Sequence, residues 1–350
     1  MPFFSICIPN FNYCKYLKIT IESVLSQSYQ DFEIIISDNA STDDSVQMLR
    51  QFTDSRITLI KNQVNLGFSP NLDKCTQNAK GKFVILLSSD DVMFPDALET
   101  IYQVIKSNNQ ENLVVMSACS VINADGLRIG SKRAMTGDVY SYIKKKKISP
   151  LMVNTNLQYE NYSSKTVLTA LLTGTFQPAG QFLATCYPTE IYRKLDGYRS
   201  IMAVHPDAHF SQRMLFQNPI VCYINKELFG YRVHEANNLA ATVNMSNIKY
   251  LTDSYILSKQ YDKAQLQSID LKAEDLEKAF VNHLIFKDAF WSLARGRAMK
   301  GIRLLAFGVA AYPNRVLWNF KFVGLNLMVF ITPVLGILFK FKKLLQGNKK

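Results

Sequence analysis

Phe4-Ser-Ile-Cys-Ile-Pro-Asn-Phe-Asn12 opens the chain as a run of apolar residues that ends in polar side chains. The pattern returns in Phe32-Glu-Ile-Ile-Ile-Ser-Asp-Asn-Ala-Ser-Thr-Asp43 and in Phe83-Val-Ile-Leu-Leu-Ser-Ser-Asp-Asp91. Short apolar runs of this kind, separated by helical patterns, are typical of strands in a mainly parallel sheet. Ligands of open α/β sheets bind beyond the carboxyl ends of the strands. The three strand ends therefore predict a site for a metal and a nucleotide.

Residues 1–125 alternate strands with helices, which predicts an α/β fold with a doubly wound, mainly parallel sheet and helices on both faces. The helix after the second strand is expected to open at Ser41-Thr-Asp-Asp44, with Ser41 or Thr42 as its N-cap. We expect further strands at 57–61 and 113–122. The other expected helices lie near 14–28, 70–79 and 95–108.

Residues 126–240 are expected to form the second half of the same domain. Within it, residues 127–162 lack clear periodicity, and we interpret them as an insertion or flexible loop over the site. Lys144–Lys147 is then a solvated loop, with a role toward a phosphate-bearing substrate as the alternative. The later patterns predict helices at 164–173, 189–195 and 207–217, and strands at 182–187, 220–224 and 227–234. Residues 241–350 predict a helical extension.

The positive charge of the chain is concentrated at its C-terminal end. Lys and Arg total 40 against 28 Asp and Glu, a net charge of +12. From Lys287 onward there are twelve Lys and Arg and one acid, so this part carries +11. A nearly neutral body argues against a nucleic-acid partner, and a basic apolar tail favours an anionic membrane surface. A soluble basic helix is the alternative.

Val323–Phe339 is apolar apart from Asn326 and Thr332 and is bracketed by Lys321 and Lys340. We expect a helix that lies in or dips into the membrane interface. A transmembrane helix and a buried helix of the soluble fold are the alternatives, the first being short of the usual span. The N-terminus shows no signal-peptide pattern, and the six cysteines form no disulfide or zinc framework, so a reducing cytoplasm is expected.

Four segments, in order along the chain, resemble motifs of the inverting family 2 glycosyltransferases, which have a GT-A fold. They are Ile8-Pro-Asn-Phe-Asn12, Asp38-Asn-Ala-Ser-Thr-Asp43, Asn65-Leu-Gly-Phe68 and Leu87-Ser-Ser-Asp-Asp91. They are similar to the family's Pro-x-Tyr/Phe-Asn segment, Asp-Asp-Gly-Ser-Thr-Asp turn, Asn-x-Gly loop and Leu-Asp-x-Asp-Asp metal motif. The likeness covers residues 3–125 well and 173–240 more loosely.

The resemblance implies a nucleotide site and a metal site. Asp38 matches the residue that contacts the nucleobase, where a carboxylate accepts the imide N–H of uracil; a turn carboxylate that caps the next helix is the alternative. Asp90 matches the metal-binding acid, with Asp91 beside it, and Mg²⁺ or Mn²⁺ prefers such oxygen ligands; an N-cap for the helix near 95 is the alternative. The other residues expected around the nucleotide are Pro9, Asn10, Phe11, Asn12, Asn65, Gly67, Ser88 and Ser89.

Three of these positions depart from the family pattern or have a simpler alternative explanation. Ser88 stands where the family usually has an Asp, so it adds no charge toward the ribose or the metal. Phe11 either packs against the base or belongs to the core. Gly67 needs only turn geometry to explain it.

The segment around Asp207 resembles the family's Glu-Asp-x-Asp-Leu-x-x-Arg motif. The match places Asp207 on the catalytic base, with Pro206 for the usual Glu and His209 for the second Asp. A carboxylate base deprotonates the attacking hydroxyl as the glycosidic bond forms, which gives inversion. The alternative is a first-turn acid that favours the helix dipole. His205 and His209 are further candidates for the base.

Tyr231-Arg-Val-His234 resembles the Tyr-Arg-x-His segment that closes many catalytic domains of the family. The resemblance implies His234 as a metal ligand and Arg232 facing the diphosphate. Alternation along a strand puts both side chains on one face. A satisfied structural histidine is the alternative for His234.

The sequence as a whole predicts a metal-dependent transferase that moves one sugar from a nucleoside-diphosphate sugar, UDP-sugar favoured, to a glycan or lipid-linked acceptor. The expected setting is cell-surface glycan synthesis, such as lipopolysaccharide or capsule, at the cytoplasmic face of a bacterial membrane. No Gln-x-x-Arg-Trp motif is present, which favours single addition over processive synthesis. A nucleotidyltransferase is the rival enzyme, although no Gly-rich loop follows the first strand. A catalytically weak sugar-binding or scaffold relative is the rival without catalysis.

Overall fold

The computed structural model describes residues 1–110, 112–132, 136–175, 183–198, 206–235, 248–330 and 332. The chain divides into two compact units. Unit 1 comprises Met1–Ala170 and Gln177–Asn247, and unit 2 comprises Leu171–Phe176 and Ile248–Lys350. Each unit has its own hydrophobic core and is described by itself.

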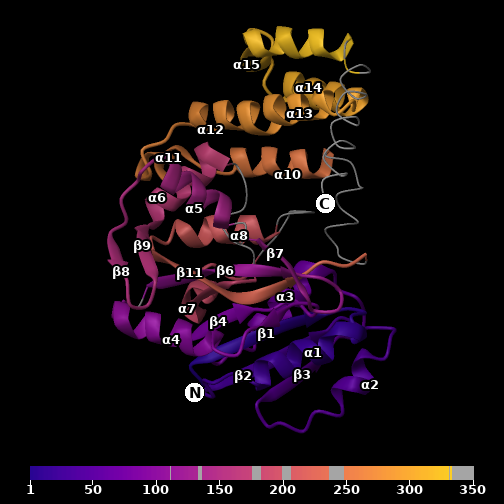
Figure 1. Ribbon diagram of the computed structural model, residues 1–350, viewed down its shortest axis with the longest axis vertical. Coiled ribbons are helices and arrows are strands. Elements are labelled where there is room, and N and C mark those ends of the chain that lie inside the picture. Colours follow the sequence, from indigo (N-terminus) through magenta and orange to yellow (C-terminus); the bar gives the residue numbers. More distant parts are fainter. Residues whose placement is uncertain are drawn as a thin grey trace, which may run out of the picture. The chain divides into compact units, whose positions relative to one another are not determined.

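Four parallel strands form the first half of the sheet in unit 1 (Figure 1). They are β1 (Phe4–Asn10), β2 (Phe32–Asp38), β3 (Ile57–Lys61) and β4 (Phe83–Leu86), in the order β3-β2-β1-β4. The register pairs Asn10 with Asp38 and Cys7 with Leu86, so the carboxyl ends of β1, β2 and β4 reach the same edge. The predicted parallel strands are confirmed.

Helices cover both faces of this half, as predicted. The helices are α1 (Cys14–Leu25), α2 (Ser45–Leu49), α3 (Phe68–Thr76) and α4 (Ala97–Asn108). Ile6 and Ile8 of β1 pack with Leu17 of α1, whereas Cys75 of α3 donates to the Ile35 carbonyl from the other face. The predicted N-cap of α2 was wrong. Asp44 holds that position, because the Ser41 hydroxyl instead accepts the backbone N–H of Asn12.

The second half of the sheet is mixed. β10 (Thr185–Pro188) runs antiparallel between β4 and β6 (Leu113–Ile122), and β11 (Ile220–Arg232) runs parallel to β6. The short β5 (Val92–Met93) pairs with β11. We predicted two strands at 220–224 and 227–234, which was wrong: β11 is one strand whose register shifts between Ile224 and Phe229. Such bulges interrupt the alternation without ending the strand.

The described parts of 127–162, residues 127–132 and 136–162, are largely helix and strand, so the prediction of a flexible loop was wrong there. They contain β7 (Arg128–Lys132), α5 (Thr136–Lys145), β8 (Met152–Asn154) and β9 (Tyr159–Ser163). Tyr140 of α5 stacks on Tyr223 of β11 with ring centroids 4.0 Å apart, and the Lys144 ammonium lies 2.6 Å from the Glu160 carboxylate. Long-range partners of this kind order a segment whose own pattern is weak.

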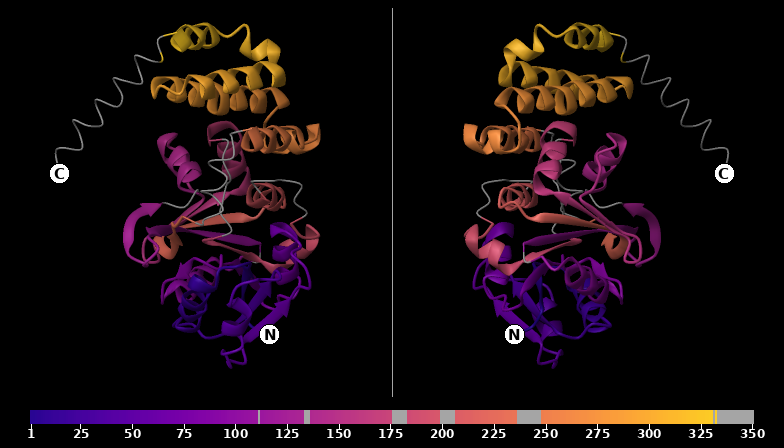
Figure 2. Two further views of the ribbon diagram at one scale, coloured as in Figure 1. Left: turned by 90° about the vertical axis from the view of Figure 1, so that its right-hand side faces the viewer. Right: turned by 90° about the vertical axis from the view of Figure 1, so that its left-hand side faces the viewer.

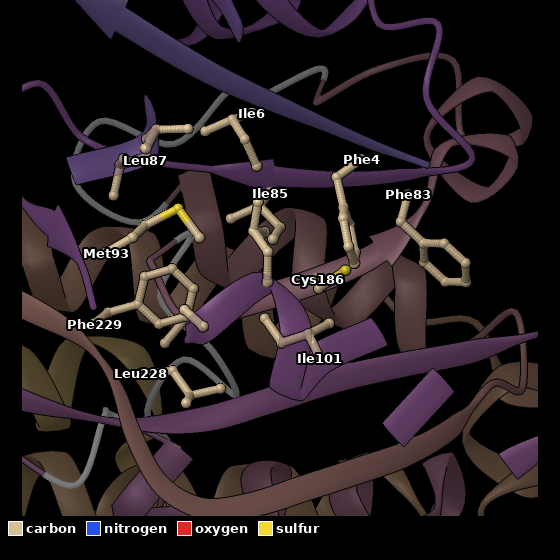
Figure 3. Close-up of a cluster of buried hydrophobic side chains, with 14 of the residues drawn as sticks. Phe4, Ile6, Phe83, Ile85, Leu87, Met93, Ile101, Cys186, Leu228 and Phe229 are labelled. Atoms are coloured by element: carbon tan, nitrogen blue, oxygen red, sulfur yellow. The ribbon is translucent and has the colours of Figure 1, made fainter. Parts of the chain in front are cut away.

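The described part of unit 1 has three more helices: α6 (Ser164–Thr169), α7 (Thr189–Lys194) and α8 (Pro206–Leu215). Figure 3 shows part of the core, where apolar side chains of β1 and β4 meet those of α4 and β11. Phe4, Ile85, Leu228 and Phe229 are almost fully buried there. Burial of apolar surface stabilises the fold by about 25 cal/mol per Å². This core therefore holds in place the strands whose ends carry the polar residues.

Unit 2 is helical, as expected for the C-terminal extension. Its helices are η1 (Ala170–Thr175), α10 (Ile248–Lys259), α11 (Lys263–Ser268), α12 (Ala273–Phe280), η2 (Val281–Phe286), α13 (Lys287–Ala294), α14 (Ala298–Ala311), α15 (Pro313–Val316) and a further helix over 320–330. No helix among the described residues has the length and apolar character to cross a membrane. The predicted apolar segment 323–339 lies partly outside the described residues.

Candidate functional site

Asn10 and Asp38 meet at the ends of β1 and β2. The Asn10 amide donates to Asp38 Oδ2 at 2.9 Å, and Asp38 Oδ1 accepts the Ser41 N–H at 3.0 Å. Both side chains are almost completely buried. Among the described residues, the buried Oδ1 of Asn10 has no hydrogen-bond partner. A buried acceptor without a donor costs free energy, and a ligand N–H that reached this pair would satisfy it.

The turn after β1 is fastened to the turn after β2. Asn12 adopts φ +58°, which Asn tolerates better than most residues, and its Oδ1 accepts the Thr42 N–H at 2.7 Å. This geometry leaves Phe11 38% exposed, so the core-packing interpretation of Phe11 fails. Pro9 is half-buried within β1 beside them.

The loop from β3 to α3 reaches the same edge through Asn39, whose amide donates to Asn65 Oδ1 at 2.8 Å and to the Gly67 carbonyl at 3.2 Å. Gly67 has φ +88°, which explains glycine there. Asn71 donates from α3 to the Ser37 carbonyl at 3.0 Å. The sequence analysis assigned no role to Asn39, and the only signal was its place in the strand-end turn.

The acidic turn after β4 contacts the end of β11. The Asp90 carboxylate lies 3.0 Å from His234 Nε2, and Asp91 Oδ1 accepts the Arg232 N–H at 2.8 Å. Burial raises the pKa of both carboxyl groups, that of Asp91 well above its usual range, and the charge of Asp90 raises it further. The Ser88 hydroxyl hydrogen-bonds to Asp91 and lowers that pKa. Ser89, which is buried, accepts through its carbonyl from Thr20 Oγ1 at 3.0 Å.

Arg232 is buried beneath this turn, with only 1% of its surface exposed. Its Nε donates to the Asp90 carbonyl at 2.7 Å, and its Nη1 donates to the carbonyls of Asn123 and Ala124. The guanidinium also lies 5.0 Å from the ring centroid of Tyr16. These contacts make Arg232 a positioning residue that holds the acidic turn against the 123–126 turn.

The predicted metal ligands fit a divalent cation in part. Two adjacent ligands of an octahedral Mg²⁺, each at about 2.1 Å, lie about 3 Å apart, which matches the separation of Asp90 and His234. One oxygen of Asp91 is engaged by backbone instead. Within the described residues, no group of three or more His, Cys, Asp or Glu is arranged to hold a metal ion.

Asp207 lies on a different element, in the first turn of α8. Burial raises its pKa to about 6, although hydrogen bonds from the Ala208 N–H and its own N–H oppose the shift. Burial and the nearby Arg213 lower the pKa of His209 to about 4, which leaves that imidazole neutral at pH 7. His205 lies outside the described residues.

Comparison with known proteins places part of the chain in a family. Residues 5–164 match the family model of glycosyl transferase family 2. This segment is a family 2 glycosyltransferase domain. It includes β1 to β4 and the acidic turn, and the match ends just before α6.

Curated glycosyltransferases are similar to part of the chain. The E. coli protein "UDP-Glc:alpha-D-GlcNAc-diphosphoundecaprenol beta-1,3-glucosyltransferase WfaP" is 40% identical over 91 residues, 26% of this chain and 36% of that protein. The chain spans about a third of the length of most of the curated relatives it matches first.

Two solved glycosyltransferases share the fold at low identity. S. aureus TarS 1-349 in complex with UDP-GlcNAc is 15% identical with a TM-score of 0.61, over 96% of this chain and 88% of that one. The mannosyltransferase PcManGT from Pyrobaculum calidifontis, in complex with GDP-Man and Mn²⁺, is 16% identical with a TM-score of 0.54, over 95% and 87%.

Proposed function

We propose that this protein is a glycosyltransferase that moves one sugar from a nucleoside-diphosphate sugar to an acceptor hydroxyl with inversion. One observation carries the proposal. The Asn10–Asp38 pair and the Asp90–His234 pair lie at the sheet edge where β1, β2, β4 and β11 have their carboxyl ends, and residues 5–164 match the family 2 model. That edge is where nucleotides bind in open α/β sheets.

The acceptor atoms of Asn10 and Asp38 favour a uracil nucleotide. The free Oδ1 of Asn10 and the carboxylate of Asp38 are acceptors, and the imide N–H of uracil is a donor. The exposed ring of Phe11 is available to pack on the base, and the Asn65–Gly67 loop contributes a further wall. The TarS complex with UDP-GlcNAc supports a UDP-sugar as the first donor to test.

Asp90 and His234 are the residues that would hold Mn²⁺ or Mg²⁺, with Asp91 behind them. Such an ion neutralises the charge that develops on a diphosphate leaving group. Arg232 positions this pair. Its Nε donates a hydrogen bond to the Asp90 carbonyl, and its backbone N–H donates one to the Asp91 carboxylate. The PcManGT complex with GDP-Man and Mn²⁺ supports a divalent ion as the cofactor.

Asp207 is the general base in this proposal. With a pKa of about 6 it is a carboxylate at pH 7, yet it holds a proton more strongly than an exposed Asp. A base poised near the working pH takes a hydroxyl proton efficiently. The acceptor oxygen then forms its bond to the sugar as the bond to the diphosphate breaks, and inversion results.

The acceptor is proposed to be a glycan or lipid-linked sugar of a bacterial surface polysaccharide, handled at the cytoplasmic face of the membrane. The support is the name of WfaP, which specifies a diphosphoundecaprenol-linked acceptor, and the basic C-terminal part of the chain. A putative teichuronic acid glycosyltransferase of Bacillus subtilis, TuaG, is 36% identical over 100 residues.

The test is release of nucleoside diphosphate from a panel of nucleotide sugars, with Mn²⁺ or Mg²⁺ and with EDTA. The expected result is metal-dependent release from one UDP-sugar that disappears in Asp207→Asn. Calorimetry on the same samples measures donor binding. If no nucleotide sugar binds in the presence of either metal, the proposal is wrong and a scaffold role takes its place.

A further inference from the structure

The last described helix of unit 2 presents an uncovered apolar face. Residues 320–330 are helical, and large apolar side chains recur on one side at three- and four-residue spacing. Their exposed fractions are Phe320 81%, Val323 58%, Leu327 64% and Phe330 82%. Trp318, just before the helix, is 87% exposed. We call these five side chains the aromatic face.

The opposite side of the same helix fixes its orientation. Leu325 is buried in the core of unit 2, and Phe322, Met328 and Val329 pack against that core. The helix, drawn in yellow, lies at the outer edge of the unit 2 helices in Figures 1 and 2. The aromatic face therefore points away from the core that holds the helix. Contiguous exposed apolar surface of this kind marks an interaction site.

Positive charge accompanies the aromatic face in the helix and in the adjoining sequence. Lys321 is exposed within the helix, and its ammonium donates to Asn282 Oδ1 at 3.1 Å. Lys287 and Lys321 both lie close enough to His283 to disfavour its protonation. From Lys287 onward the chain carries twelve Lys and Arg against one acid. A second copy of the chain would bring like charges together, which opposes self-association.

We propose that the aromatic face docks on the surface of an anionic lipid bilayer. Rings and aliphatic side chains enter the boundary between headgroups and acyl chains, while the lysines pair with anionic headgroups. A bilayer supplies both the apolar region and the negative charge that these residues require. The inference rests on the membrane location proposed above and is independent of the chemistry of transfer.

Sedimentation of the full-length protein with vesicles tests the proposal. Vesicles of phosphatidylglycerol and phosphatidylcholine should bind the protein, and vesicles of phosphatidylcholine alone should bind it weakly. The double variant Phe320→Ser with Phe330→Ser should partition at least about tenfold less, because two apolar rings are lost. Lys321→Glu should reduce binding about fivefold or more. The controls Leu151→Ser and Lys146→Glu alter exposed residues of unit 1 and should bind as the wild type does.

Two outcomes would overturn the proposal. Equal partition of the double variant and the wild type would exclude the aromatic face as the contact. A dimer that the double variant converts to monomer in light scattering, with no change on vesicles, would assign the face to a second copy. Donor cleavage in solution is measured on every variant. Its absence from the wild type, with vesicle binding intact, would reject the proposed activity and leave the docking surface standing.

Discussion

The carboxyl group of Asp207 sets a pH limit on the reaction. Asp207→Asn should lower the transfer rate by about 10² to 10⁴, the usual contribution of a general base, without weakening donor binding. In the wild type the rate should fall as the pH drops below about 6, because the base becomes protonated. Steady-state rates from pH 5 to 8 measure this limb. Glu190→Gln is the matched control, since Glu190 is an exposed acid in the first turn of α7.

The buried carboxylate of Asp207 should lower the free energy of unfolding at neutral pH. Burial raises the pKa of Asp207 from 3.8 to about 6, so the folded state holds the proton more tightly than the unfolded chain does. Stability therefore falls as the pH rises through this interval and stays lower above it, by at most about 3 kcal/mol. Asp207→Asn should raise the free energy of unfolding at pH 7 and have little effect near pH 4. Urea titrations at both pH values decide it, and a less stable variant at pH 7 would contradict the buried carboxylate.

Arg232 should matter more for stability than an exposed arginine. Arg232→Met removes the donor from three backbone carbonyl oxygens and should cost about 3 kcal/mol, the range for breaking a buried polar network. Arg128→Met is the control, because its ion pair with Glu227 is 62% exposed on the arginine side and should be worth about 1 kcal/mol or less. Urea unfolding of both variants gives the comparison, and equal losses would refute the positioning role.

At the scale of elements, substitutions at two glycines distinguish the effect of backbone strain from that of steric clash. A Cβ at Gly67 or at Gly130 would meet no atom within 4 Å, but Gly67 alone has a positive φ, +88°. Gly67→Ala should therefore cost about 1 kcal/mol and weaken nucleotide binding through the Asn65 loop. Gly130→Ala in β7 should be neutral or slightly stabilising. Thermal unfolding and calorimetry with UDP measure both effects; if the two substitutions behave alike, strain in the loop is not the cause.

The parallel strands and the site at their ends could be predicted because the relevant information is local. Each of β1, β2 and β4 is a mainly apolar run with polar side chains at its end or within two residues of it, so this prediction needs neither the pairing order nor the side-chain contacts. The engagement of Asp91 with the Arg232 N–H could not be predicted, because it joins residues 141 positions apart through a backbone group. Pattern alone likewise gave two strands for β11, since its bulge breaks the alternation.

Long-range contacts also explain why 127–162 was misjudged. α5 and β9 are held by the Tyr140–Tyr223 stack and the Lys144–Glu160 ion pair, and neither pair is visible in the periodicity of the segment. β10 enters the sheet antiparallel between β4 and β6, although it follows β6 by more than sixty residues in the chain. Local strand propensity does not indicate which strands β10 will lie between.

For the whole molecule, the two separate cores imply that UDP with Mn²⁺ and an anionic membrane should each stabilise a different unit. Hydrogen exchange of the full-length protein tests this. UDP with Mn²⁺ should slow exchange in the strand-end segments 9–12, 38–43, 65–68 and 88–91 of unit 1, because binding stabilises only the parts that the ligand contacts. Anionic vesicles should instead slow exchange within 317–330. The control for the first ligand is the same mixture with EDTA.

The pattern of protection separates binding from a general tightening of the fold. Each core is closed within its own unit, with Phe4 and Ile85 in one and Phe280 and Leu304 in the other, so protection has no shared core through which to spread. Protection of 273–286 by UDP and Mn²⁺ would contradict this independence. Protection of the strand ends without metal, equal to that with metal, would show that Asp90 and His234 act only on the fold. Protection that requires metal would make this pair the link between the cation and the nucleotide.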